Sequence, residues 1–89
     1  MISQRLQDFL LTWCNPETQP EEVARMLGGQ SGAYYQDWLQ TEMLAAARQG
    51  ELTPASVERL TGLGFDDQRE VTSWLRTIWP MWFSRPYPE

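Results

Sequence analysis

The chain lacks histidine and lysine entirely, and its 89 residues include a single cysteine. Without histidine it has neither the commonest general base nor the commonest ligand of transition metals. Nucleophilic catalysis needs a base beside the nucleophile, and only carboxylates could serve here. One cysteine cannot form an intramolecular disulfide, which excludes a small secreted scaffold held by disulfides. We therefore predict a protein that is not an enzyme and that uses no metal and no cofactor.

Long apolar runs are also missing. The longest, such as residues 44–47, are far too short to cross a bilayer, and the first residues lack the basic start and apolar stretch of a signal peptide. Together with the single thiol, these features predict a cytoplasmic protein without a membrane partner. The net charge of −5 disfavours nucleic acid as a partner, because the phosphate backbone would repel an acidic surface.

The residues that are present are those of a folded protein. Hydrophobic residues make up 42% of the chain, aromatic residues 12% and charged residues only 21%, which is too apolar for the disordered class. A chain of this length buries roughly two-thirds of the surface that it exposes when unfolded. That burial supports one domain with one modest core.

Apolar residues recur at helical spacing in five segments, and no segment keeps the period of two that marks a strand. In the first segment Ile2, Leu6, Phe9 and Trp13 form one stripe. Proline or glycine separates the segments, as is typical of helix ends. The predicted fold class is all-α, with five helices over residues 2–14, 20–27, 31–49, 54–61 and 68–79.

Two short patterns occur twice in the chain. A proline is followed by valine three residues later at residues 20–23 and 54–57, and a Trp-Leu pair stands at residues 38–39 and 74–75. These patterns are compatible with two related helical hairpins that follow the N-terminal helix. Chance reuse of proline caps and apolar pairs explains them slightly better.

The C-terminal residues 79–89 are rich in aromatic residues and proline. We expect the last helix to stop at Pro80, so that a helical domain over residues 1–78 is followed by a separate tail. Tryptophan, tyrosine, phenylalanine and arginine are enriched at the centres of protein interfaces. An alternative is that the tail folds back and closes the small core. The residues predicted to bind a partner protein, or a second copy of this chain in a homodimer, are Trp79, Trp82, Phe83 and Tyr87.

A second pattern resembles a helix-turn-helix. The segments over residues 54–61 and 68–79 would form its two helices, and the second helix carries polar residues on one face, opposite its apolar stripe. The connection is longer than usual, and Asp66 and Asp67 would repel phosphate. In this alternative, a DNA-binding transcriptional regulator, the DNA-binding residues are Arg69, Thr72, Ser73 and Arg76.

The absence of catalytic residue types and the aromatic tail favour protein binding over catalysis. The sequence predicts a small acidic adaptor, or an inhibitor of the antitoxin or immunity type, that acts on another protein. Acidic residues of the first half supply most of this expected acidic surface, namely Glu17, Glu21, Glu22, Asp37 and Glu42.

Overall fold

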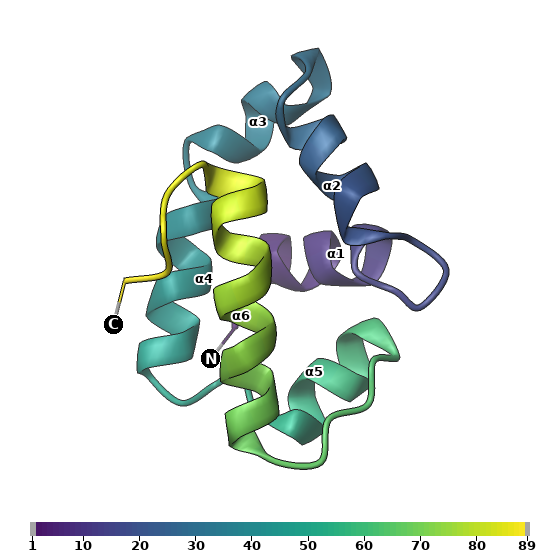
Figure 1. The fold of residues 1–89 in the computed structure, drawn as a ribbon, viewed down its shortest axis with the longest axis vertical. Coiled ribbons are helices and arrows are strands. Elements are labelled where there is room, and N and C mark those ends of the chain that lie inside the picture. Colours follow the sequence, from purple (N-terminus) through teal and green to yellow (C-terminus); the bar gives the residue numbers. More distant parts are fainter. Residues whose placement is uncertain (1, 89) are drawn as a thin grey trace.

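The computed structural model describes residues 2–88, and within this range the chain is all-α with no strand. Six α-helices and one short 3₁₀ helix form a rounded molecule with a radius of gyration of 12.0 Å (Figure 1). The predicted fold class is confirmed, whereas the count of five helices is not. The elements are α1 (Gln4–Trp13), α2 (Pro20–Leu27), η1 (Gln30–Gly32), α3 (Ala33–Gln36), α4 (Leu39–Arg48), α5 (Pro54–Thr61) and α6 (Gln68–Phe83).

Local sequence signals determine several helix ends. Pro20 and Pro54 each stand at the start of a helix, where a missing N–H costs nothing. The Thr53 hydroxyl accepts a hydrogen bond from the backbone N–H of Ser56, and the Ser56 hydroxyl accepts one from that of Thr53, which completes a capping box. At the other end of α5, Gly62 adopts a φ of 78°, a left-handed conformation that favours glycine.

The single helix predicted over residues 31–49 is wrong. The chain forms η1, α3 and α4 there, and the helix is interrupted at Asp37 and Trp38, where Trp38 has a φ of −137°. No proline or glycine marks this break. Its result is that the consecutive side chains of Trp38 and Leu39 are both buried in the core. The predicted pair of related hairpins is not shown, because only one of its two Trp-Leu segments lies within an unbroken helix.

The expected helix end at Pro80 is also wrong. Helix α6 continues through Pro80 to Phe83, and therefore crosses the boundary that we expected between domain and tail. A proline inside a helix costs about 3 kcal/mol. Burying one tryptophan contributes on the order of 4–6 kcal/mol, and Trp79 and Trp82 on either side of Pro80 are 0% and 7% exposed. The free energy gained by burying these two tryptophans therefore outweighs the cost of a proline within the helix.

Helix α6 is the long central element of the fold (Figure 1). It packs mainly on α2, whereas α1 packs on α5 and α4. Helix α4 lies on one side of α6, and the α1–α2 and α5–α6 loops lie on the other side (Figure 1). The core between these helices includes Leu6, Phe9, Leu10, Val23, Leu39, Met43, Val57, Val71, Leu75, Ile78 and Trp79.

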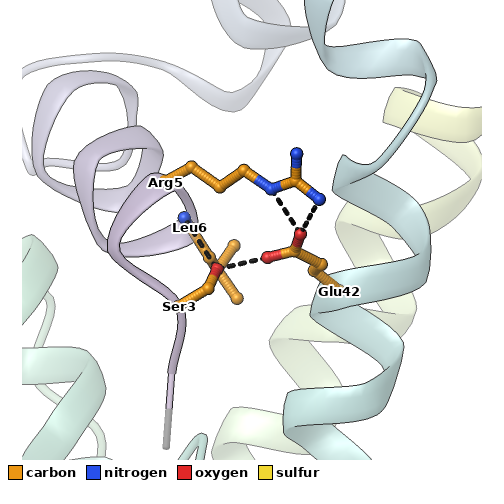
Figure 2. Close-up of polar contacts among 4 residues, drawn as sticks. All are labelled: Ser3, Arg5, Leu6 and Glu42. Carbon is orange, nitrogen blue, oxygen red and sulfur yellow. Dashed lines mark hydrogen bonds and ion pairs between the residues drawn. The ribbon is translucent and has the colours of Figure 1, made fainter.

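A polar cluster at the surface joins α1 to α4. Glu42 of α4 accepts a hydrogen bond from the Ser3 hydroxyl and forms an ion pair with Arg5 of α1 (Figure 2). The Ser3 hydroxyl also accepts a hydrogen bond from the backbone N–H of Leu6 and so caps α1. The Arg5 guanidinium lies 4.7 Å from the centre of the Trp38 ring, a distance typical of a cation–π contact.

None of the helices in the described part of the chain is long and apolar enough to span a membrane.

Candidate functional site

The structure places the predicted aromatic tail against the core. Trp79 is fully buried, and its ring makes edge-to-face contacts with Phe83 and Tyr87 at centroid distances of 4.8 and 5.0 Å. Trp82 is also buried, while Phe83 and Tyr87 are partly exposed. Trp79 therefore offers no free surface in this conformation, and only 7% of Trp82 is exposed. For Phe83 and Tyr87, partner binding stays a prediction.

The four residues of the DNA-binding alternative all lie on α6. Arg69, Ser73 and Arg76 are exposed, and the Thr72 hydroxyl donates a hydrogen bond to the backbone carbonyl of Gln68. The structure thus places them along the outward face of one helix. Helices α5 and α6 pack mainly on α1 and α2 rather than on each other, unlike the compact helix pair of a helix-turn-helix.

A groove that neither prediction described lies beside α6, and of the predicted site residues only Trp82 lines it. Its volume is about 360 Å³, and it is bordered by the α1–α2 loop, the α5–α6 loop and the side of α6. In Figure 1 both loops lie on the same side of α6, at the right of the view. We call this the two-loop groove. Its walls are mainly apolar and aromatic, and they include Trp13, Pro16, Pro20, Leu63, Phe65 and Trp74.

The α1–α2 loop is held in a fixed shape by its own hydrogen bonds. The Asn15 side-chain oxygen accepts from the backbone N–H of Glu17 at 3.0 Å, and the Asn15 carbonyl accepts from the N–H of Thr18 at 3.1 Å. Such bonds are typical of Asx turns. Pro16 of this loop lies against the end of α5, where a Cβ on Gly62 would approach Pro16 Cδ to 3.3 Å. The close approach and the positive φ of Gly62 both favour glycine there.

The α5–α6 loop forms the opposite wall. Thr61 anchors its start, because the Thr61 hydroxyl donates to the Val57 carbonyl and accepts from the N–H of Leu63 at 3.0 Å. Further along, the ring of Phe65 packs on that of Trp74 with 5.6 Å between centroids. Both rings are partly exposed and face the groove. Because both walls are anchored in this way, the groove is pre-formed.

Buried groups close the base of the groove. Trp82 of α6 lines it, and the Trp82 indole N–H donates to the Pro20 carbonyl at 3.1 Å, which ties α6 to the start of α2. Cys14 also lines it and is buried, and that burial raises the pKa of the thiol to about 12. A thiol with such a pKa is protonated at neutral pH and is a poor nucleophile. The groove therefore contains a cysteine that is not activated.

Exposed acidic residues stand next in the sequence to residues that line the groove, and we call them its acidic rim. Glu17 is exposed in the α1–α2 loop, and Glu21 is exposed in the first turn of α2. On the opposite wall, Asp66 and Asp67 follow Phe65 directly, and Glu70 lies beside Trp74 in an adjoining hollow of about 400 Å³. An apolar groove with an acidic rim attracts a partner that combines apolar and basic groups.

Sequence reasoning missed this groove because its walls come from loops far apart in the chain. One local signal existed, since Leu63 and Phe65 are apolar residues in a loop, where polar residues prevail.

Within residues 2–88, no three histidine, cysteine, aspartate or glutamate side chains are grouped closely enough to hold a metal ion. Comparison of this chain with models of protein families, with curated proteins and with solved structures finds no match.

Proposed function

We propose that this protein is a non-catalytic protein-binding module, a small acidic adaptor or inhibitor, and that its partner docks a segment in the two-loop groove. The observation that carries the proposal is the pre-formed aromatic groove with its acidic rim. Exposed tryptophan and phenylalanine rings in a concave, rigid site are typical of the residues that dominate binding energy at interfaces. The cytoplasm, where a single thiol stays reduced, is the compartment that we propose.

The groove is rigid, and this rigidity favours a role in binding over apolar surface that is exposed without a function. Anchored loops lose little conformational freedom when a partner binds, so more of the contact energy is retained as affinity. The partly exposed rings of Phe65 and Trp74 pack on each other, and Trp74 also packs on the buried Trp82. They are thus held in place before binding. The protonated Cys14 thiol in the groove argues for recognition rather than chemistry.

Site-specific photo-crosslinking in the native cell tests this proposal. A photoreactive phenylalanine analogue replaces Phe65 in one variant, and in the control variant it replaces Ala45, which is exposed on α4 across the molecule. We expect one protein to be captured from position 65 and not from position 45. That protein, once purified, should bind the unmodified chain and lose at least about tenfold in affinity against Trp74→Ala. Equal capture at both positions, or unchanged affinity for Trp74→Ala, would refute the proposed site.

A further inference from the structure

Within residues 2–88, Arg5 occupies a complete site for an arginine side chain. Arg5 lies over the face of Trp38 and forms an ion pair with Glu42, which stands four residues after the tryptophan. The tryptophan supplies a flat apolar face and the glutamate supplies the opposite charge. Figure 2 shows the Arg5 side chain reaching from α1 to the Glu42 carboxylate on α4.

The same pair of residue types occurs beside the two-loop groove, without an arginine between them. Glu70 and Trp74 are four residues apart on α6, so they lie only about 40° apart around the helix. Both line the hollow that adjoins the groove, and Trp74 lines the groove as well. In the described part of the chain, no arginine pairs with Glu70. The two arginines of α6, Arg69 and Arg76, are placed at about 140–160° from Trp74 around the helix axis.

The Glu70 carboxylate is already oriented. Its Oε1 atom accepts a hydrogen bond from the backbone N–H of Asp66 at 2.7 Å, and the Glu70 backbone N–H donates to Asp67 Oδ1 at 3.0 Å. These bonds fix the carboxylate beside the hollow and use one of its two oxygens. Asp66 and Asp67 add further negative charge at the same point.

We propose that Glu70 and Trp74 bind an arginine side chain of the partner protein, as Glu42 and Trp38 bind Arg5. The inference rests on the proposed function, because the arginine would belong to the segment that occupies the two-loop groove. The guanidinium stacks on the exposed part of the Trp74 ring and pairs with Glu70. The residue beside the arginine in the partner, an apolar or aromatic one, enters the groove between Pro16 and Phe65.

Arginine fits this site better than lysine does. Its guanidinium is planar, stacks on aromatic faces and is more weakly hydrated than an ammonium group, so it loses less on leaving water. The positive end of the α6 dipole opposes a cation at this site. Three carboxylates, those of Asp66, Asp67 and Glu70, are exposed at that end of the helix and offset this term.

Selection of random peptides displayed on phage, against the full-length chain, tests the inference. We expect the selected peptides to share an arginine next to an apolar or aromatic residue. The tightest peptide is then synthesised with arginine and with citrulline, a neutral side chain of nearly the same shape. On the unmodified chain, citrulline should weaken binding about tenfold, the combined effect of a cation–π contact and a partly exposed ion pair.

The variants show whether Glu70 and Trp74 cause this preference. In Glu70→Gln and in Trp74→Leu, the affinity ratio between the two peptides should fall towards one. The matched control Glu58→Gln removes an exposed carboxylate of α5 and should keep the full ratio. Circular dichroism and thermal unfolding confirm that each variant is folded.

The outcomes separate this inference from the proposed function. Selected peptides without arginine, or a citrulline effect that Glu70→Gln leaves unchanged, would overturn the arginine site. In that case crosslinking of a partner at position 65 still supports the protein-binding module. Failure to select any peptide, together with no specific crosslink at position 65, would overturn both.

Discussion

The two Trp-Leu pairs of this chain have opposite surroundings in the folded protein. Trp38 is 6% exposed, at a break between two helices, beneath Arg5 and close to Glu42. Trp74 lies within the unbroken helix α6, partly exposed at the edge of the two-loop groove and one turn after Glu70. In both pairs the leucine is buried. The leucines thus make equivalent contributions to the core, while the tryptophans differ.

This difference separates residues that stabilise the fold from residues that are available for binding. At Trp38 the cation comes from α1, the carboxylate from α4 and the ring from the residue just before α4, and these contacts hold the two helices together. Figure 2 shows the pairing of Arg5 with Glu42. At Trp74 a ring and a carboxylate lie on one helix, with an open hollow beside them. A partly exposed aromatic residue in a concave site, next to a carboxylate with which no arginine of residues 2–88 pairs, supports the proposed role in binding.

Truncating the two tryptophans should give the largest contrast. We expect Trp38→Ala to lower the free energy of unfolding by about 3–5 kcal/mol, because it leaves a cavity in the core. Trp74→Ala should cost about 1–2 kcal/mol, since part of its ring already contacts water. Urea denaturation followed by circular dichroism measures both. Equal losses would contradict the contrast in burial.

A conservative substitution at Trp38 tests separately the role of its ring and the role of its indole N–H. The Trp38 indole N–H is buried and has no hydrogen-bond partner among residues 2–88. Trp38→Phe keeps a ring beneath Arg5 and removes this unsatisfied donor, which relieves a penalty of about 1–3 kcal/mol. We therefore expect Trp38→Phe to be much less destabilising than Trp38→Ala.

The buried thiol in the two-loop groove makes the stability of the protein depend on pH. Burial raises the pKa of Cys14 to about 12 from an unperturbed 9.0, so the folded state retains the proton more strongly than the unfolded state does. Its contribution is fully present below pH 9 and is lost as the pH rises towards 12, at about 1.4 kcal/mol per unit. Cys14→Ala should reduce the slope of stability against pH in this range. An unchanged slope would mean that water already reaches the thiol and that the groove opens readily.

Sequence alone predicts the parts of this fold that depend on neighbouring residues. Pro54 after Thr53 indicates a capped helix start, and Gly62 indicates a helix end, because these signals act within one turn. The break at Trp38 and the passage of α6 through Pro80 have no such local cause. Both depend on burial against other helices, which outweighs local preference by several kcal/mol.

The groove was not predictable for a related reason. Pro16 meets Gly62 only after α1 has packed on α5, and Trp82 reaches the Pro20 carbonyl only because α6 does not end at Pro80. The sequence left two interpretations of the aromatic residues near the C-terminus open, a surface for a partner or a segment that closes the core, and the structure buries Trp79 and Trp82 in the core. Phe65 and Trp74 are instead partly exposed in the groove, and composition alone cannot distinguish them from the other aromatic residues.

The smallest expected effects come from substitutions of the two glutamates, Glu42 and Glu70. Partial burial raises the pKa of the Glu42 carboxyl, but hydrogen bonds from Ser3 and Arg5 and the Arg5 charge outweigh it, so the pKa lies below its usual 4.5. The depressed pKa makes Glu42 contribute to stability above pH 4.5, and this contribution is lost as the pH falls through its folded pKa. Glu42→Gln should therefore destabilise the protein by about 0.5–1 kcal/mol at pH 7 and by less in acid, as expected for a partly exposed ion pair.

Glu70→Gln is the matched substitution, because Glu70 has no arginine partner in the described residues and its hydrogen bond from Asp66 can be kept by an amide oxygen. We expect its stability to stay within about 0.5 kcal/mol of the unmodified protein at pH 7, as for other surface substitutions. Thermal unfolding of both variants at pH 7 and pH 3 measures the difference. A loss at Glu70→Gln as large as that at Glu42→Gln would show that Glu70 already serves the fold, and it would remove the reason to assign it to a partner.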